Sequence, residues 1–290
     1  MIIRGNETVL VQGITGKQGT FWAERMRDYG TKIIGGVNPK KAGTQHLDLP
    51  VWGSAKDAAA ETQIDVSVLF IPPLGVKAAA LDAIQGGIKK LVIMTEHVPV
   101  QDVMEVMAAA KAAGTKIIGP NTAGLVTPGE CFVGFMPAFN PHVFKPGNIG
   151  VISRSGSLGT LLCLNVVQNG MGVSAFVGIG GDPIIGTTTT DALRSLDEDE
   201  KTVAIALVGE IGGSMEEDAA EYAKGMSKPI AAFIAGAASP PGKKMGHAGA
   251  IVMGNKGSYA GKKAALEAAG VTVCATPSGV PLVLKDKLGL

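Results

Sequence analysis

His247 lies in the glycine-rich segment Gly246–Ala250 (GHAGA) of this 290-residue chain. A neutral imidazole is a nucleophile, and it can carry a covalent intermediate when another side chain orients its ring. Glu210, in Gly209–Gly213 (GEIGG), is the candidate partner. A carboxylate can accept the second ring N–H and stabilise a charged imidazole. These two residues are therefore predicted to form a catalytic pair that could carry a phosphoryl group.

Glycine-rich turns recur in the second half of the chain, and at least three of them directly follow predicted strands. In an open parallel sheet, loops at the carboxyl ends of strands meet at one crevice, where helix N-termini can bind an anion. A histidine in a glycine loop is otherwise a surface residue, but the converging loops and the nearby acid favour catalysis. The four turns are Ser153–Ser157, Gly178–Pro183, Gly209–Ser214 and Gly246–Ala250.

A further glycine turn, Gly13–Gly19 (GITGKQG), follows the first predicted strand and opens a helix. Its spacing is Gly-x-x-Gly-x-x-Gly, which differs from the dinucleotide fingerprint Gly-x-Gly-x-x-Gly. Where an NAD site places an acidic residue after the second strand, this chain has Lys40 and Lys41. The two lysines suit an extra phosphate, either the 2′-phosphate of NADP or the 3′-phosphate of CoA. The simpler interpretation of the lysines is a solvated turn.

The elements that must position these turns form two α/β units. Short apolar strands alternate with helical segments in both halves, a pattern typical of parallel sheets covered on both faces. We place the first domain at 1–122, a connecting loop or hairpin rich in Pro and Gly at 123–147, and a second domain at 148–290. The expected strands are Thr8–Val11, Lys32–Val37, Val66–Ile71, Lys90–Met94, Lys116–Ile118, Ile149–Ser153, Val173–Val177, Val203–Val208, Pro229–Phe233 and Val271–Val273. The expected helices include Gln18–Tyr29, Ser54–Glu61, Val76–Gln85, Val100–Ala113 and Tyr259–Ala269.

Composition narrows the functional classes. The formal net charge of +1 provides no global field for nucleic acid or an anionic membrane. The three cysteines are far apart, with neither metal-site nor disulfide spacing, which fits a reducing compartment. We find no apolar run of membrane length and no signal-peptide pattern. We expect a cytoplasmic protein of a bacterial or archaeal cytosol, or of the mitochondrial matrix if a transit peptide was removed.

Taken together, these motifs resemble the α subunit of succinyl-CoA synthetase and its relatives. They occur in the family's order and cover nearly the whole chain, except its C-terminal end. The matching segments are Gln12–Gly19, Thr95–Glu96, Gly119–Asn121, Ser153–Gly156, Val177–Pro183, Gly209–Gly213 and Met245–Ala250.

The resemblance implies a Rossmann-like CoA-binding domain followed by a flavodoxin-like domain. It implies that ATP or GTP, with Mg²⁺, phosphorylates His247, that the phosphoryl group passes to a small organic acid, and that CoA displaces phosphate to give acyl-CoA. Glu210 would steady the phosphohistidine. A separate β subunit with an ATP-grasp fold would bind the nucleotide, in an αβ or α2β2 assembly. The implied CoA-binding residues are Thr15, Gly16, Lys17, Gln18, Lys41, Thr95 and Glu96. Ser153, Ser155 and Gly156 would bind phosphate, and Asn121 and Thr160 would lie at the substrate.

The chain departs from the family pattern at informative positions. Thr160 stands where the family has a Tyr associated with the acid, and Leu161 stands where it has Glu. His97 replaces a usual Gly, and Thr122 a frequent Cys. The resemblance implies succinate or a related small acid. Loss of the Tyr opens space and removes a hydroxyl, so the alternative is relaxed specificity or another acid such as malate, citrate or sulfoacetate. An NADP-dependent oxidoreductase and a non-catalytic CoA-binding regulator remain as alternatives of other classes.

Overall fold

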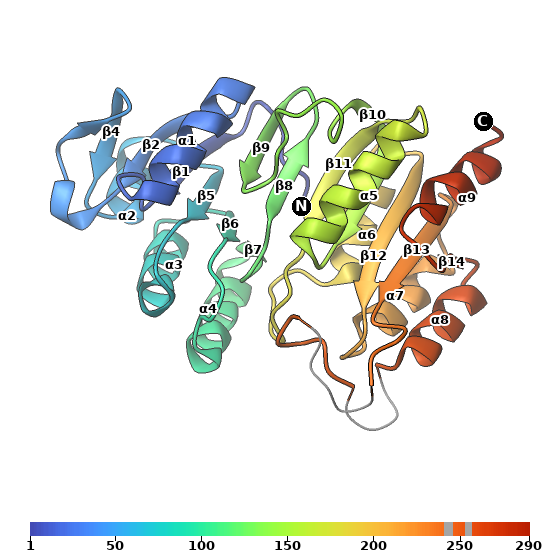
Figure 1. Ribbon diagram of the computed structural model, residues 1–290. Helices are drawn as coiled ribbons and strands as arrows, with labels where there is room; N and C mark the ends of the chain where they lie inside the picture. The colour runs from blue at the N-terminus through green and yellow to red at the C-terminus, as the bar shows by residue number, and fades with distance from the viewer. Residues whose placement is uncertain (241–245, 253–256) are drawn as a thin grey trace.

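A computed structural model gives the structure of residues 1–240, 246–252 and 257–290. Two α/β lobes lie side by side, each built on a seven-stranded sheet (Figure 1). Met245, the first residue of the predicted histidine motif, lies outside the described residues. No helix in the described parts of the chain is long and apolar enough to cross a membrane.

The first sheet has the order β3-β4-β2-β1-β5-β6-β7. Its strands are parallel except β3, which runs antiparallel to β4 at the edge. Numbered along the chain, the parallel strands follow the 3-2-1-4-5-6 order of a Rossmann sheet, which reverses between β1 and β5. The bounds are β1 Thr8–Gln12, β2 Lys32–Val37, β3 Gln45–His46, β4 Leu49–Trp52, β5 Val66–Leu69, β6 Lys90–Ile93 and β7 Lys116–Ile118.

The second sheet has the order β14-β13-β12-β10-β11-β8-β9. Its parallel strands follow the flavodoxin-like order 2-1-3-4-5, which reverses between β10 and β12. The predicted pair of α/β units with mainly parallel sheets is therefore confirmed. The bounds are β8 Gly124–Thr127, β9 Cys131–Gly134, β10 Pro146–Ser153, β11 Val173–Gly178, β12 Ala204–Glu210, β13 Ile230–Ala235 and β14 Thr272–Cys274.

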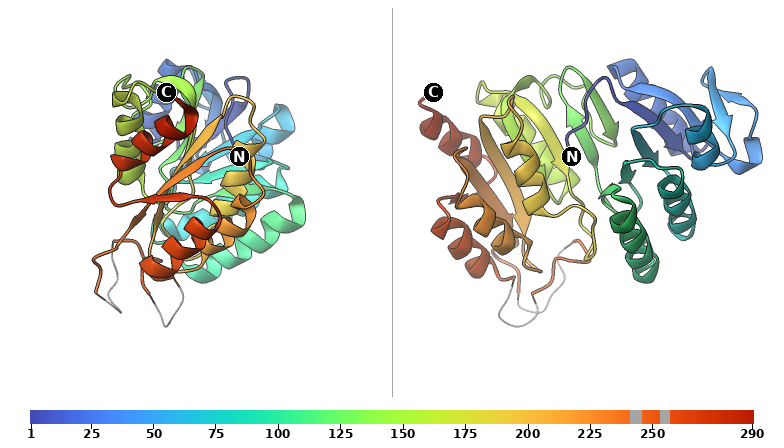
Figure 2. Two further views of the ribbon diagram at one scale, coloured as in Figure 1. Left: turned by 90° about the vertical axis from the view of Figure 1, so that its right-hand side faces the viewer. Right: turned by 180° about the vertical axis from the view of Figure 1, so that it is seen from behind.

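The segment 123–147 was expected as a connection, and it does contain a hairpin. Its strands β8 and β9 also extend the second sheet, because β8 pairs antiparallel with β11. The other side of the hairpin packs on the first lobe, where the Trp22 and Tyr29 rings of α1 contact Phe132 of β9 edge-on, with centroids 6.5 and 5.5 Å apart. The hairpin therefore contacts both lobes, and the right-hand view of Figure 2 shows it between them.

Helices cover both faces of each sheet. In the first lobe α2, α3 and α4 pack in sequence on one face, and α1 packs on the other (Figures 1 and 2). In the second lobe α6, α7 and α8 lie together, while α5 and α9 share the opposite face. The bounds are α1 Lys17–Tyr29, α2 Ala55–Glu61, α3 Val76–Gln85, α4 Val100–Ala113, α5 Gly156–Gln168, α6 Thr189–Asp197, α7 Met215–Ala223, α8 Tyr259–Ala268 and α9 Gly279–Leu288. Short 3₁₀ turns span Pro39–Lys41 and Pro73–Gly75.

Local sequence accounts for most of these elements. In α4, for example, Val103, Val106 and Ala110 recur at helical spacing and are buried, and Gly114 ends the helix at φ 66°. Strand β5 is buried along its whole length. Ligands of doubly wound sheets bind beyond the carboxyl ends of the strands, where the strand order reverses. The fold therefore marks two crevices, one after β1 and one after β10 and β12.

Candidate functional site

The two predicted catalytic residues meet beyond the end of β12. His247 lies in the loop after β13, and its Nδ1 donates a hydrogen bond of 2.7 Å to Oε2 of Glu210, the last residue of β12. The Glu210 side chain is 8% exposed, and that of His247 is 26% exposed. Among the described residues, no hydrogen bond is made to Nε2 of His247. The carboxylate therefore orients the ring through one nitrogen and leaves the other available for chemistry.

Arg154 completes this cluster, although the sequence analysis quoted it only as part of a turn. Its Nε lies 3.3 Å from Oε1 of Glu210, and the guanidinium also faces the backbone carbonyls of Gly180 and Asp182, at 3.5 and 3.4 Å. The side chain is buried, so its charge is weakly screened. Arg154 therefore balances the buried carboxylate on the side opposite the imidazole. Its position in the glycine-rich turn Ser153–Ser157, directly after a strand, is the sequence signal that could have identified Arg154.

The environment of His247 favours its protonated form. The hydrogen bond that His247 donates to Glu210 raises the pKa of His247 above its usual value, while burial and Arg154 act to lower it. Glu96, across the cavity, raises the pKa further. Because only the unprotonated nitrogen is nucleophilic, the reactive fraction of His247 increases as the pH rises through this raised pKa.

Glycine 181 shapes the space for the imidazole. A Cβ atom at this position would lie 2.5 Å from Cγ and 2.7 Å from Nδ1 of His247. Its own N–H donates to the carbonyl of Asn121, which fixes the turn. The glycine turn 178–183 therefore packs directly against the catalytic ring, as the predicted convergence of the turns requires.

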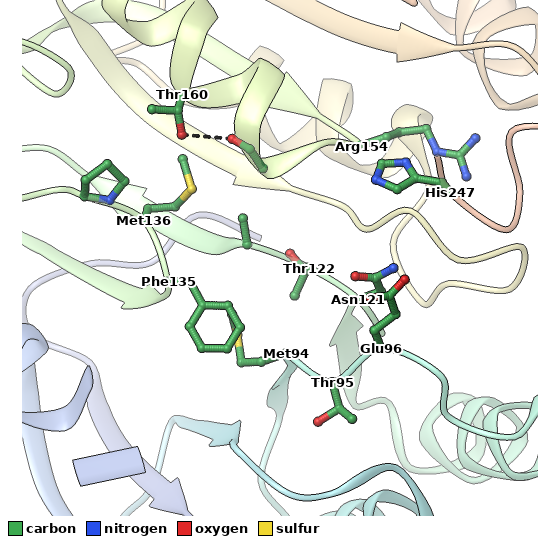
Figure 3. A pocket seen from close by; sticks show the side chains of 13 residues that line it. Met94, Thr95, Glu96, Asn121, Thr122, Phe135, Met136, Arg154, Thr160 and His247 are labelled. Atoms are coloured by element: carbon green, nitrogen blue, oxygen red, sulfur yellow. Dashed lines mark hydrogen bonds between the residues drawn. The ribbon is translucent and has the colours of Figure 1, made fainter. Parts of the chain in front are cut away.

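A cavity of about 520 Å³ opens beside His247. Figure 3 shows His247 and Arg154 at one end, with Asn121 and Glu96 beside them, and Thr160, Met136 and Phe135 toward the other. Two residues predicted at the substrate, Asn121 and Thr160, are therefore part of its wall. The full lining is Met94, Thr95, Glu96, Asn121, Thr122, Ala123, Phe135, Met136, Pro137, Arg154, Gly156, Thr160 and His247.

Asn121 is held in an unusual backbone conformation at the edge of this cavity. Its φ is 55°, and its Nδ2 donates to Oδ1 of Asp182 at 3.0 Å. Burial raises the pKa of Asp182. The contact joins the turn after β7 to the turn after β11, so the two lobes meet at the cavity.

The predicted phosphate-binding residues head helix α5. Ser155 is its N-cap and accepts the N–H of Leu158 at 3.3 Å, while the hydroxyl of Ser153 donates to the carbonyl of Ser155 at 2.6 Å. Gly156 lines the cavity, whereas neither Ser153 nor Ser155 does. The start of α5 therefore faces the cavity mainly through its backbone.

The departures from the family pattern have visible structural consequences. His97 lies at φ 63°, a region that favours glycine, which explains why a Gly is usual there. Thr122 is buried, and its hydroxyl donates to the carbonyl of Gly178 at 2.5 Å. The hydroxyl of Thr160 donates to the carbonyl of Gly156 at 2.9 Å, so it is engaged within its own helix. Leu161 is 40% exposed.

A second cavity, of about 730 Å³, lies beyond the first strand. Six of the seven residues implied for CoA line it, namely Thr15, Gly16, Lys17, Gln18, Lys41 and Thr95. Glu96, the seventh, lines the histidine cavity.

The shape of this second cavity fits a phosphate-bearing ligand. The N-cap of α1, Gly16, supplies no side-chain acceptor, so the first N–H groups of the helix are available to an anion. Glycine is required nearby, since a Cβ on Gly19 would lie 2.1 Å from the carbonyl oxygen of Gly13. Asn38, which the sequence analysis missed, donates to Thr15 Oγ1 at 2.5 Å.

The two cavities share part of their walls. Met94, Thr95 and Phe135 line both. A ligand anchored at the glycine turn by its phosphates can therefore extend past these residues toward His247. The hydrogen bond from the hydroxyl of Thr95 to the carbonyl of Ile71, at 2.6 Å, stabilises this shared wall.

Comparison with known proteins agrees with this geometry. Residues 5–97 match the sequence family described as a CoA binding domain, and residues 152–272 match the family described as CoA-ligase. The chain is 47% identical to succinate–CoA ligase [ADP-forming] subunit alpha 2 of Archaeoglobus fulgidus, over 99% of both chains. It is 40% identical to an ADP-forming sulfoacetate–CoA ligase subunit of Bilophila wadsworthia, over 100% of this chain and 99% of the relative.

Solved structures are similar as well. ATP citrate lyase of Methanosaeta concilii, determined in complex with (3S)-citryl-CoA, superposes with a TM-score of 0.90 at 25% identity. The match covers 99% of this chain and 51% of that chain, so this chain spans about half of the lyase. These relatives give no support to an NADP-dependent oxidoreductase. The chain belongs to the family of succinate–CoA ligase α subunits, and it is a CoA-binding subunit of an NDP-forming acid–CoA ligase.

Proposed function

We propose that His247 is the phosphoryl carrier of this ligase and that Nε2 is the atom that carries the group. One observation supports this most strongly: Nδ1 is held by Glu210 at 2.7 Å, and His247 lines the cavity. With Nδ1–H committed to the carboxylate, the lone pair for attack on phosphorus lies on Nε2.

In this proposal, each residue of the cluster has a separate role in phosphoryl transfer. Nε2 attacks the terminal phosphorus of a nucleoside triphosphate, the bond to the nucleoside diphosphate breaks, and Glu210 stabilises the positive charge of the phospho-imidazole. The carboxylate of the acid then takes the phosphoryl group, which gives an acyl phosphate and frees the ring. The thiol of bound CoA then attacks the acyl carbon, the bond to the phosphate oxygen breaks, and inorganic phosphate leaves as the thioester forms. Arg154 lies 3.3 Å from Oε1 of Glu210 and pairs with the carboxylate on the side away from the imidazole.

The CoA site proposed here is the cavity after β1. Backbone N–H groups at the start of α1 and the side chains of Lys17 and Lys41 would bind its phosphates. The shared wall of Met94, Thr95 and Phe135 would guide the thiol arm toward His247. Glu96 would lie near the reacting end, because it lines the histidine cavity.

The nucleotide is assigned to a partner. Relatives of this chain are named as α subunits, which implies a β subunit. We propose that this β subunit has an ATP-grasp fold, binds ATP or GTP with Mg²⁺, and brings the triphosphate to the cavity beside His247. The assembly would be αβ or α2β2.

The acid is proposed to be a small organic acid whose pocket includes Asn121 and Thr160. Since Thr160 leaves the space of the family's Tyr open and its hydroxyl bonds to Gly156, the preference should differ from that of a Tyr-containing relative. A screen of succinate, malate, citrate and sulfoacetate by CoA thioester formation identifies the substrate. Thr160→Tyr should move the preference toward succinate; an unchanged profile would place the selectivity elsewhere.

The test of the carrier uses the full chain with its β subunit and γ-labelled nucleotide. We expect an acid-labile, base-stable label on the wild type and none on His247→Ala. His142→Ala is the matched control, because His142 is exposed and outside both cavities, and it should label fully. Full labelling of His247→Ala would overturn the proposal.

A further inference from the structure

A buried ion pair contacts the backbone of Glu210. Lys262, in the first turn of α8, and Glu216, in the first turn of α7, are both 0% exposed. Lys262 Nζ donates to Oε2 of Glu216, and to Oε2 of Glu217 at 3.1 Å. Apolar side chains of similar volume could fill this space without the desolvation cost of two charges, so packing alone does not account for the pair.

The second carboxylate oxygen of Glu216, Oε1, points to the end of strand β12. Oε1 accepts a hydrogen bond from the backbone N–H of Glu210 at 3.2 Å. Gly209 makes room for this contact, because a Cβ there would lie 2.7 Å from Oε1 of Glu216. The carboxylate of Glu216 therefore fixes the end of β12, at the residue whose side chain holds the imidazole.

Glu217 extends the same network toward the segment 246–252 that contains His247, here called the histidine loop. Its Oε1 accepts the N–H of Gly257 at 3.3 Å, and the carbonyl of Gly257 accepts the N–H of Gly212 at 2.8 Å. Gly212 in turn packs on the histidine loop so closely that a Cβ would lie 2.2 Å from the carbonyl oxygen of Gly249. Lys262 thus links two backbone segments near His247. Through Glu216 it reaches the end of β12, and through Glu217 it reaches Gly257, which bonds to Gly212.

We propose that Glu216 and Lys262 are positioning residues for the reaction at His247, because together they hold the end of β12 where the Glu210 carboxylate reaches Nδ1. Neither residue lines either of the two cavities that flank the shared wall, so they act through Glu210 and not on the substrate. Their catalytic meaning rests on the proposed role of His247. The mechanical coupling itself can be measured without any phosphoryl transfer.

The readout is the protonation of His247, so the charges that face the ring must be known. Among residues 1–240, 246–252 and 257–290 they are Glu210 at the end of β12, Arg154 after β10, Glu96 after β6 and Asp182 after β11. The hydrogen bond that His247 donates to Glu210 is the largest cause of the raised pKa of His247. If the end of β12 moves, this bond lengthens and the pKa falls.

The experiment labels the full chain with ¹³C at histidine Cε1 and assembles it with unlabelled β subunit, which leaves four histidine signals to follow by NMR. The test variant is Glu216→Leu with Lys262→Met, since an apolar pair preserves packing and folding. We expect the titration midpoint of His247 to fall by about half a pKa unit or more, roughly a threefold change in its protonation constant. The other three histidines should titrate as in the wild type.

Two comparisons distinguish positioning from a general loss of stability. Glu216→Gln with Lys262→Met removes both charges but keeps an oxygen for the N–H of Glu210, so its midpoint should fall less than that of the Leu/Met variant. Lys228→Met removes another ammonium of the same lobe, which donates to the carbonyls of Leu196, Asp197 and Asp199. This control should lower the melting temperature without moving the His247 midpoint.

A wild-type midpoint in the Leu/Met variant would overturn the inference, and so would an equal fall in Lys228→Met. If the Leu/Met variant fails to fold, Glu216→Asp is measured in its place. It keeps the ion pair but withdraws the carboxylate from Glu210, so the same fall is expected. A shifted midpoint together with full labelling of His247→Ala would reject the carrier role and leave the coupling standing.

Discussion

The two crevices of this molecule are built in different ways for their proposed ligands. The crevice after β1 is built from backbone: a glycine turn, an uncapped helix N-terminus and the exposed lysines Lys17 and Lys41. The crevice after β12 is built from buried charges, with Arg154, Glu210 and His247 in contact. The difference matches the chemistry, because holding phosphates needs N–H groups and positive charge, whereas covalent catalysis needs one ring held in one orientation.

Glu210→Gln should give the largest difference between the two crevices, because it should slow phosphoryl transfer and leave CoA binding unchanged. The amide cannot stabilise the charged imidazole, so phosphoryl transfer to His247 should slow by about 10²–10⁴-fold. The initial rate of labelling with the β subunit measures this. CoA affinity, measured by calorimetry on the same variant, should remain unchanged; a parallel loss of CoA binding would show that the crevices are not independent.

A pair of glycine substitutions should break one crevice at a time. Gly19→Ala places a Cβ 2.1 Å from the carbonyl of Gly13, and Gly181→Ala places one 2.5 Å from the His247 ring. Each overpacked site should cost about 1–3 kcal/mol.

Each of these two variants should lose a different function and keep the other. We expect at least about a tenfold loss of CoA affinity in Gly19→Ala, and a similar loss of labelling rate in Gly181→Ala. Gly225→Ala is the control, because its Cβ would meet nothing closer than 3.7 Å. Equal loss of both functions in either variant would contradict the separation.

The pH dependence should report only on the second crevice. The folded-state pKa of His247 is raised above 6.5, the usual value of a histidine side chain, chiefly by its hydrogen bond to Glu210. Protonation of His247 therefore contributes stability that is fully present below pH 6.5 and is lost as the pH rises through the raised pKa.

Melting temperatures of the wild type and Glu210→Gln, followed across this range, should differ most on the acid side and converge on the alkaline side. The labelling rate of the wild type should rise with pH through the same pKa. A difference in melting temperature that grows with pH would contradict the assigned sign.

The smallest effect is expected from Lys41→Ala. The lysine is exposed, so its contribution to phosphate binding is screened by salt. CoA affinity should fall about three- to tenfold at low ionic strength and less at high ionic strength. Lys145→Ala, an exposed lysine outside the cavity, should leave CoA affinity unchanged. A salt-independent loss in Lys41→Ala would indicate a direct, desolvated contact instead.

Local patterns predicted much of the fold. The ranges expected for Val76–Gln85 and Val100–Ala113 coincide with α3 and α4, because each has apolar residues at helical spacing and a glycine directly after its last residue. Helix α9 was missed, although Ser278 before it and Gly289 after it are end signals. The segment of β8 and β9 was expected only as a connecting loop or hairpin, because the pairing of β8 with β11 joins segments far apart in the chain.

In the site, too, the residues close together in the sequence were easier to predict than contacts between distant residues. Glu210 was chosen as the partner of His247 from chemistry, and the two side chains are in contact although 37 residues separate them. Arg154 and the Glu216–Lys262 pair were not predicted, because a contact between residues 46 positions apart leaves no spacing signal. The glycine turn after β1 was found more completely, since its chemistry is contained in consecutive residues.

The most direct test of the central claim is the identity of the phosphorylated atom. The full chain with ¹⁵N-labelled histidine is phosphorylated by the β subunit and nucleotide, and ¹⁵N and ³¹P NMR spectra then identify the nitrogen bonded to phosphorus. Because Glu210 holds Nδ1 at 2.7 Å, the phosphoryl group should be on Nε2 of His247. A phosphoryl group on Nδ1, or on any residue other than His247, would contradict the account.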